Sequence, residues 1–345
     1  MRALALGGVG GLDQLAVRDV PEPALRSAAD VLVRVRAAAL NHLDLFVARG
    51  LPGASQVFPH IVGSDAAGIV EAVGPAVRAV APGDRVMINP GISCGTCQAC
   101  LEGDESLCRS FQLLGEHLPG TIAEFVVVPE ANVVAVPGTM PLERAAAFSL
   151  VTLTAWRMLT TRALLRAGET VLIWGIGGGV AQAALQIAKL LGAYAIVTSG
   201  TDRKLDAARA LGADAELNHA RVDIPAEVKR LTGGRGADVV VDSVGQRTWA
   251  LSLRALRRGG RLVVCGATTG PMVELDLRRL FWHQWTLMGS TMGSRREYRE
   301  IVRLAALGRL WPVVDTVVPL ERAVEAVARL AGGEQFGKVV IEVAT

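Results

Sequence analysis

The chain has 345 residues, of which 36 are Lys or Arg and 33 are Asp or Glu, so its formal net charge is +3 with His neutral. At roughly 150 residues per domain the length predicts about two domains, and a hydrophobic content of 51% excludes a disordered chain. Lys and Arg never form a run longer than two residues, which argues against a nucleic-acid partner. No apolar stretch reaches the ~18 residues that span a bilayer, and the N-terminus lacks a signal-peptide pattern, so we expect a cytoplasmic protein without a membrane partner.

The first part of the chain, to about residue 135, predicts short strands and few helices. Residues 31–36 alternate apolar and polar side chains with period two, as a half-buried strand does. Further strands bounded by Gly and Pro are expected over 68–74, 84–89 and 123–128, and one helix over 41–49. This region is therefore predicted to form a small, partly open β-barrel.

From about residue 150 the pattern changes to alternating strands and helices. The expected strands cover 170–174, 194–198, 238–242 and 261–265, and the expected helices cover 180–191, 202–211 and 246–257. Repeated strand–helix units predict a parallel, doubly wound sheet. The tail is predicted to hold helices over 295–307 and 320–332 and a final strand over 338–343.

Four of the five cysteines lie within 15 residues of one another, at Cys94, Cys97, Cys100 and Cys108. In a reducing compartment such a cluster favours a metal over disulfides, and four thiolates at this spacing suit one tetrahedral Zn²⁺ better than an iron–sulfur cluster. Gly95 and Gly103 permit the sharp turns that the lobe needs. Because the protein supplies all four ligands, we expect a structural zinc. Cys265 ends an apolar strand, and we expect a small buried hydrophobe there.

A glycine-rich segment follows the strand expected over 170–174 and opens the helix that comes next. Glycines let the backbone approach a pyrophosphate, and the N-terminus of a helix attracts its charge. The spacing is an imperfect dinucleotide-binding fingerprint, but its place inside a strand–helix–strand unit favours that interpretation over a simple tight turn. The residues expected to contact the cofactor are Gly175, Gly177, Gly178, Gly179 and Val180.

The end of the second strand of such a domain contacts the cofactor ribose, where an NAD site needs Asp or Glu. This chain has Ser199 there, and Asp202 is interpreted as a helix cap. Arg203 and Lys204 follow, and a 2′-phosphate needs such cations. The pattern therefore favours NADPH over NADH. The alternative is that both cations lie on a solvated helix face.

Together these features resemble the medium-chain dehydrogenase/reductase superfamily of zinc-binding dehydrogenases, in particular its NADPH:quinone oxidoreductase branch. The resemblance spans essentially the whole chain and includes the segments 63–68, 83–86, 120–125 and 337–340. It implies an α/β fold with a GroES-like β-barrel domain and an inserted Rossmann domain with a doubly wound parallel sheet. It also implies an active site in the cleft between the domains and a homodimer or homotetramer.

The domain boundaries follow from the same resemblance. The GroES-like domain is expected to comprise residues 1–150 with 293–345, and to carry the zinc lobe at about 91–112. The Rossmann domain is expected over 151–292.

One departure from the superfamily's alcohol dehydrogenases matters most. In the enzymes of that resemblance, two Cys and one His bind a second, catalytic zinc. At the corresponding positions this chain has Asn41, Ser64 and Leu150. Because these residues are poor zinc ligands, we expect no catalytic zinc. The alternative is a non-standard metal site, and its candidate ligands are His42, His60, Asp65 and His117. A simpler interpretation treats His60 and His117 as hydrogen-bonded loop residues.

The quinone oxidoreductase branch implies metal-free hydride transfer from NADPH to a small molecule: a quinone, a carbonyl or an activated alkene such as an enone or enal. The resemblance places Lys338 at the cofactor phosphates. Along the nicotinamide it places Thr154, Gly245 and Gly266. Asn41 and Ser64 are expected to donate hydrogen bonds to the acceptor oxygen, with Asp65 orienting Asn41 or a water.

Two other functions compete with this reductase. The first is an alcohol dehydrogenase with a non-standard catalytic zinc site. The second is a non-catalytic NADPH-binding protein, in which case Asn41 would serve only as a helix cap.

Overall fold

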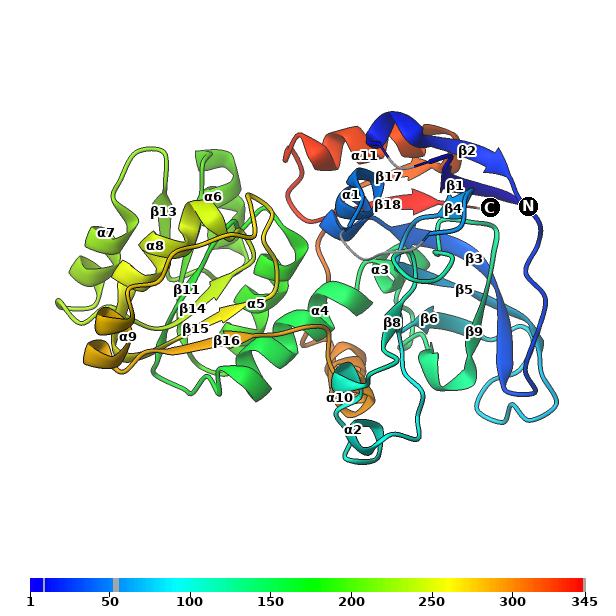
Figure 1. The fold of residues 1–345 in the computed structure, drawn as a ribbon, viewed down its shortest axis with the longest axis horizontal. Helices are drawn as coiled ribbons and strands as arrows, with labels where there is room; N and C mark the ends of the chain where they lie inside the picture. Colours follow the sequence, from blue (N-terminus) through cyan, green and yellow to red (C-terminus); the bar gives the residue numbers. More distant parts are fainter. Residues whose placement is uncertain (9, 52–55, 344–345) are drawn as a thin grey trace. The chain divides into compact units, whose positions relative to one another are not determined.

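The computed structural model describes residues 1–8, 10–51 and 56–343. The chain divides into two compact units, residues 1–150 with 294–345 and residues 151–293 (Figure 1). Among the described residues, no helix has both the length and the apolar character that crossing a bilayer requires.

The first unit is built on a seven-stranded sheet in which β3 is central. The order along the sheet is β10-β6-β5-β3-β18-β17, with β9 also paired to β3. The strands are β3 (Asp30–Ala39), β5 (Asp65–Val73), β6 (Arg85–Ile88), β9 (Phe125–Pro129), β10 (Val133–Ala135), β17 (Val314–Pro319) and β18 (Lys338–Glu342). β18 comes from the C-terminal tail and pairs antiparallel with β3, so that Val340 lies opposite Ala39. The tail therefore completes the sheet of the N-terminal part.

Smaller elements surround this sheet. A three-stranded sheet and a two-stranded ribbon contain β1 (Arg2–Leu6), β2 (Leu15–Asp19), β4 (His60–Ile61), β7 (Gly91–Ile92) and β8 (Gln112–Leu113). The helices of this unit are α1 (His42–Arg49), α2 (Gln98–Leu101), α3 (Leu142–Ala146), α10 (Arg295–Ala306) and α11 (Ala323–Ala331). Its described residues also form 3₁₀ turns at Leu12–Gln14, Glu105–Leu107, Glu130–Asn132 and Leu320–Arg322.

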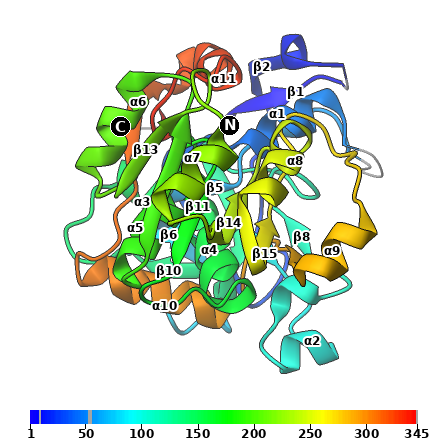
Figure 2. The ribbon, with the colours of Figure 1, turned by 90° about the vertical axis from the view of Figure 1, so that its left-hand side faces the viewer.

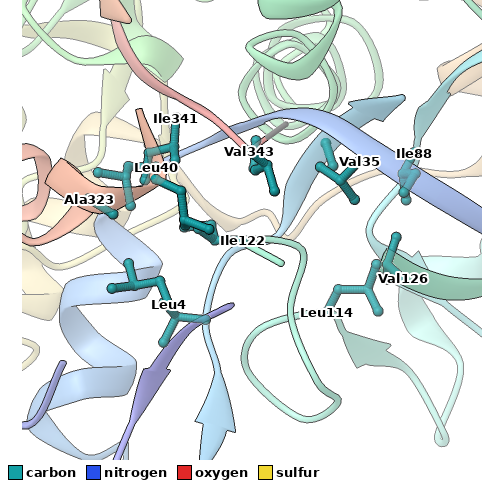
Figure 3. Close-up of a cluster of buried hydrophobic side chains, with 14 of the residues drawn as sticks. Leu4, Val35, Leu40, Ile88, Leu114, Ile122, Val126, Ala323, Ile341 and Val343 are labelled. Carbon is teal, nitrogen blue, oxygen red and sulfur yellow. The ribbon is translucent and has the colours of Figure 1, made fainter. Parts of the chain in front are cut away.

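The alternation predicted for residues 31–36 is present in β3. Val31, Val33 and Val35 are fully buried, whereas Arg34 faces outward and pairs with Glu71 of β5. Figure 3 shows side chains from distant parts of the chain meeting in this core, among them those labelled Leu4, Val35, Leu40, Ile122 and Ile341. Burying each Val or Leu contributes about 1.5–3 kcal/mol, so this shared core fixes the tail strand against β3.

The second unit contains a six-stranded parallel sheet with the order β13-β12-β11-β14-β15-β16. Its strands are β11 (Thr170–Ile173), β12 (Tyr194–Ser199), β13 (Ala215–Asn218), β14 (Ala237–Asp242), β15 (Leu256–Val264) and β16 (Thr286–Gly289). The chain runs outward from β11 to β13 and then returns to β14 on the other side of β11. Because crossovers between parallel strands are right-handed, this reversal places helices on both faces of the sheet (Figure 2). The predicted α/β class with a doubly wound sheet is therefore confirmed.

The helices of this unit pack against the sheet in two groups. α5 and α6 contact β11 to β13, while α8 contacts β14 and β15 and is itself contacted by α7. Their bounds are α5 (Gly179–Leu190), α6 (Asp202–Ala210), α7 (Ile224–Leu231), α8 (Gln246–Ala255) and α9 (Leu277–His283). α4 (Ser149–Trp156) leads into the unit and continues as a π-helix over Arg157–Arg162.

Most predicted boundaries differ from the structure by one to three residues, as helix and strand ends commonly do. Two differences have a structural cause. The helix expected over 246–257 stops at Ala255, because Leu256 already pairs with Ala237 and starts β15. The helix expected over 320–332 starts as a 3₁₀ turn and becomes α-helical only at Ala323.

Candidate functional site

The four cysteines of the lobe converge on one point in the first unit. Their Sγ atoms all lie within 4.8 Å of one another, and the Cys97–Cys100 and Cys94–Cys108 sulfur pairs are each 3.5 Å apart. Four sulfurs bound about 2.3 Å from one tetrahedral Zn²⁺ stand about 3.8 Å from each other. The residues present therefore fit a single zinc ion.

The backbone of the lobe prepares these sulfurs for a metal. Gly95 and Gly103 have φ angles of 75° and 79°, a conformation that side chains with a Cβ rarely adopt. The backbone N–H groups of Thr96 and Cys97 lower the pKa of the Cys94 thiol to about 6. The thiolate, which is the form that binds metals, is thereby favoured.

Cys265 lies apart from the lobe, directly after β15. The residue as a whole is partly exposed, while its thiol is buried. Burial of its thiol, with the Asp242 carboxylate nearby, raises its pKa to about 12. A thiol with this pKa is a poor nucleophile and a poor metal ligand at neutral pH.

The glycine-rich segment forms the expected strand–loop–helix in the second unit, between β11 and α5. Gly175 has a φ of 69°, and Gly178 is the N-cap of α5, whose first turn contains Gly179 and Val180. A Cβ placed on Gly178 would lie in ordinary van der Waals contact with the Gly175 carbonyl oxygen, 3.5 Å away. Gly177 lies inside the same loop. This geometry fits a dinucleotide pyrophosphate.

The end of β12 offers no free acid to a cofactor ribose. Ser199 is buried, and its Oγ accepts the N–H of Thr201. The prediction that Asp202 caps the next helix is wrong, because Thr201 is the N-cap of α6. The Asp202 carboxylate instead accepts from Asn218 Nδ2 at 2.7 Å and pairs with Arg221 at 2.8 Å, while Arg203 and Lys204 lie in the first turn of the same helix.

The positions expected along the nicotinamide also lie in the second unit. Gly245 is the N-cap of α8 with a φ of 85°, and a Cβ on Gly266 would come within 3.0 Å of the Ser243 carbonyl oxygen. Thr154 is buried, with its hydroxyl 3.8 Å from Met292 Sδ. Their contacts with a nicotinamide remain predictions.

A buried carboxylate that the sequence analysis did not single out links these segments. Asp242, at the end of β14, is fully buried and accepts hydrogen bonds from four residues, namely Val244, Gly245, Thr248 and Ser252. The Ser252 hydroxyl in turn accepts from Trp174 Nε1 at 2.8 Å, directly before the glycine loop. The position of this Asp at a strand end was a signal for it, because the carboxyl ends of parallel strands are where ligands bind.

A second buried polar network lies in the first unit. Lys338 Nζ donates to Asn41 Oδ1 at 2.5 Å and to Asp65 Oδ2 at 3.0 Å. Asn41 Nδ2 donates to the same Asp65 oxygen at 3.0 Å, and the Leu150 N–H donates to Asp65 Oδ1 at 2.8 Å. The Lys338 side chain is 4% exposed and that of Asp65 is 0% exposed, so this is an interior ion pair.

Strand register brings these three side chains together. Asp65 and Val340 both pair with Ala39 of β3, and the Leu40 N–H donates to the Val339 carbonyl. Continuing the antiparallel register by two residues places Lys338 opposite Asn41. Because side chains two residues apart in a strand share a face, the network forms on one face at this end of the sheet.

Asn41 also begins a helix, as the alternative interpretation expected. It is the N-cap of α1, and the carboxylate of Asp44 accepts its N–H at 2.7 Å. The other oxygen of Asp44 accepts the Gly63 N–H at 2.9 Å. Burial raises the pKa of Asp44 to about 6, against the opposing effect of these two hydrogen bonds and of Lys338. Burial, with Lys338 and Arg49 nearby, lowers the pKa of His42, which favours the neutral imidazole.

Ser64 and two histidines have other partners. The Ser64 hydroxyl is fully buried and donates to the Leu114 carbonyl at 2.8 Å. His60 Nε2 lies 3.0 Å from the Gly115 carbonyl oxygen, and His117 Nδ1 accepts the Leu113 N–H at 3.2 Å. Among the residues that the structure describes, the four lobe cysteines are the only group of three or more His, Cys, Asp or Glu gathered closely enough to bind a metal. The candidate ligands His42, His60, Asp65 and His117 do not form such a group.

Comparisons with known proteins agree with this architecture. Residues 27–138 match the family described as alcohol dehydrogenase GroES-like domain, and residues 179–306 match the family described as zinc-binding dehydrogenase. The chain is 32% identical to an alcohol dehydrogenase of Geobacillus stearothermophilus, over 95% of this chain and 96% of that protein. It is also 32% identical to the acryloyl-coenzyme A reductase of Metallosphaera sedula, over 94% and 95% of the two chains.

A solved structure gives the same result for the whole fold. The crystal structure of an NAD-dependent alcohol dehydrogenase superposes with a TM-score of 0.95 at 46% identity, covering 100% of both chains. Family match, relatives and fold all indicate an oxidoreductase. The chain therefore belongs to the zinc-binding dehydrogenases of the medium-chain dehydrogenase/reductase superfamily.

Proposed function

We propose that the protein is an NADPH-dependent reductase of a quinone or an activated alkene, such as an enone or enal, and that it works without a catalytic metal. The observation that carries this proposal is the Lys338–Asp65–Asn41 network. The Lys338 ammonium lies within hydrogen-bond distance of the Asp65 carboxylate and of the Asn41 amide oxygen. Asn41 is at one of the positions where the resemblance places a zinc ligand of the alcohol dehydrogenases. A fixed positive charge beside these groups disfavours a second cation.

The cofactor would bind in the second unit. The glycine loop and the N-terminus of α5 suit its pyrophosphate, and a bound reduced nicotinamide would supply hydride to the acceptor. The Asp242 hydrogen bonds to Gly245 and Ser252, together with the Ser252–Trp174 bond, hold the loop and the turn after β14 in fixed positions. The relative named acryloyl-coenzyme A reductase supports an activated alkene as substrate, because acryloyl thioesters have a conjugated C=C–C=O group.

Turnover with a panel of acceptors tests the reaction class. We expect NADPH oxidation with 2-cyclohexenone, 2-hexenal or 1,4-benzoquinone, with kcat/KM about 100-fold or more above that for any alcohol with NADP⁺. Faster oxidation of alcohols would contradict the proposal and favour an alcohol dehydrogenase. Tight binding of NADPH without turnover of any acceptor would favour a non-catalytic role.

We also propose that NADPH is preferred to NADH. Ser199 offers no carboxylate to a ribose 2′-hydroxyl, and Asp202 is already paired with Arg221 and Asn218. Arg203 and Lys204 supply positive charge in the first turn of α6, close to the end of β12. A 2′-phosphate is stabilised by such charges and would be repelled by an acid.

The ratio of KM values for the two cofactors tests this preference. We expect KM for NADPH to be about tenfold lower than for NADH, and Arg203→Gln to remove most of that difference. The control is Arg209→Gln on the same helix, because Arg209 pairs with Glu216 and Asp206 and should not alter the ratio. Equal KM values, or a lower KM for NADH as the name of the solved alcohol dehydrogenase suggests for that protein, would refute the preference.

We further propose that Cys94, Cys97, Cys100 and Cys108 hold one structural zinc. The sulfur–sulfur distances support a single tetrahedral ion. With four protein ligands the ion would have no open position for a substrate, and its role would be to cross-link the lobe.

A further inference from the structure

The four lobe cysteines differ in how open they are to solvent. Cys94 is exposed, Cys97 and Cys100 are partly buried, and Cys108 is buried. The chain beside Cys94 leaves open space, because a Cβ on the next residue, Gly95, would meet no atom within 4 Å. A sulfur that binds zinc is a thiolate, and its oxidation by a peroxide depends on access to solvent. Cys94 is therefore the lobe cysteine that a dissolved oxidant reaches first.

A second sulfur stands beside that of Cys94. Cys94 Sγ lies 3.5 Å from Cys108 Sγ, against 3.9 Å from Cys100 Sγ. The Cys94 N–H also donates to Cys108 Sγ at 3.5 Å, so two residues that are 14 positions apart are fixed side by side. A disulfide bond measures about 2.05 Å, so the two sulfurs need to approach by about 1.5 Å. Cys108 is thus placed to resolve an oxidised Cys94.

We propose that Cys94 is an oxidation site, at which a peroxide converts the zinc-binding lobe into a lobe closed by a Cys94–Cys108 disulfide. The inference rests on the structural zinc of the proposed function. It concerns residues of the first unit alone and requires neither a cofactor nor a substrate of the reductase. Cys97 and Cys100, whose sulfurs are also 3.5 Å apart, remain reduced in this first step.

The step balances with hydrogen peroxide as the oxidant. The Cys94 thiolate attacks one peroxide oxygen, so that an S–O bond forms, the O–O bond breaks and hydroxide leaves. The Cys108 thiolate then attacks the Cys94 sulfur, forms the S–S bond and expels a second hydroxide. Two thiolates have together lost two electrons, and one peroxide has been reduced to two hydroxide ions. A zinc ion that keeps only two of its four thiolates is bound weakly and is released.

The reacting cysteines adjoin the contacts that join the lobe to α10. Ser93, which accepts from the Arg295 guanidinium, directly precedes Cys94. Glu105, which accepts the Arg295 N–H, lies three residues before Cys108. Loss of the zinc releases both positions, so oxidation of the lobe should also loosen the first turn of α10.

The experiment uses the zinc-loaded full chain and hydrogen peroxide. A chromogenic chelator follows zinc release, and samples taken over time are alkylated with iodoacetamide and mapped by mass spectrometry. Trypsin alone leaves all four cysteines on one peptide, residues 86–109, because this segment has no internal Lys or Arg. Glu-C cleavage after Glu102 and Glu105 separates Cys108 from the other three. A bond to Cys108 therefore appears as two linked peptides.

We expect release of about one zinc per chain, together with linked peptides in which Cys97 and Cys100 are alkylated and Cys94 is not. Dithiothreitol with added zinc should restore the starting state. Cys265, whose thiol is buried, should be oxidised at least about tenfold more slowly. The matched control is Cys265→Ser, which lacks the cysteine outside the lobe and should release zinc as the wild type does.

Two results would overturn the proposal. One is a first disulfide between Cys97 and Cys100, and the other is a Cys94 oxidised no faster than Cys265. The zinc assignment is judged separately, by elemental analysis before peroxide is added. A chain that holds no zinc but still forms the Cys94–Cys108 disulfide would refute the structural zinc and support the oxidation site.

Discussion

Cys97→Ser should reduce the zinc content from about one ion per chain to below about 0.1 and lower the thermal midpoint of the protein by on the order of 5–10 °C. A serine hydroxyl does not replace a thiolate as a zinc ligand, and the three remaining sulfurs leave an open, weaker site. The two short strands and the one-turn helix of the lobe have few buried residues, so a bound metal would be the main source of its stability.

The effect should spread beyond the lobe along identified contacts. Arg295, at the start of α10, donates its N–H to Glu105 at 3.1 Å and a guanidinium N–H to Ser93 Oγ at 3.2 Å. Hydrogen exchange should therefore speed up over residues 91–113 and in the first turn of α10, while the six-stranded sheet remains protected.

The control for this experiment is Cys265→Ser. It removes the fifth cysteine, which lies outside the cluster and whose thiol pKa is raised to about 12, so zinc content should stay at about one per chain. If Cys97→Ser keeps its zinc and its thermal midpoint, the lobe does not depend on a bound ion and the assignment is wrong.

The elements that could be predicted from the sequence are those with a strong local signal. α5 was expected over 180–191 and lies at Gly179–Leu190, because its apolar spacing and the flanking glycines define both ends. β3 followed from its alternation of apolar and polar side chains. Short elements such as β4 and β7, at two residues each, carry no period that a sequence can reveal.

Non-local pairing limited what could be predicted about the candidate site. The cysteine cluster is close in sequence, so its spacing alone brought its four members together. Lys338 is separated from Asn41 by 297 positions and from Asp65 by 273. Their contact depends on how β18 is registered against β3, and only the structure fixes that register.

The sequence also did not reveal which hydrogen-bond partners each polar side chain would have. Asn41 and Ser64 were expected to offer free donors, but a side chain's partners depend on every element around it. The Asp202 cap failed for the same reason, because Asn218 and Arg221 come from the neighbouring strand and loop. In these cases the residue types were noted correctly, and the structure determined which bonds they make.

Lys338→Met as a single change should cost about 3 kcal/mol or more of folding free energy, whereas Asp65→Asn/Lys338→Met should recover most of that loss. The single variant leaves the Asp65 carboxylate fully buried with only the Leu150 N–H and the Asn41 amide as partners, and an uncompensated buried charge costs about 3–5 kcal/mol. The double variant removes both charges. Urea unfolding of the wild type, both single variants and the double variant gives the coupling energy directly.

A matched control separates burial from charge. Lys189 pairs with Asp214 at 2.6 Å, but these side chains are 33% and 27% exposed. Water can therefore solvate Asp214 once its partner is gone, and Lys189→Met should cost only about 1 kcal/mol. A Lys338→Met protein as stable as the Lys189→Met protein would mean that Asp65 is solvated or protonated in the folded state. The network would then lack the fixed ion pair from which the metal-free site is inferred.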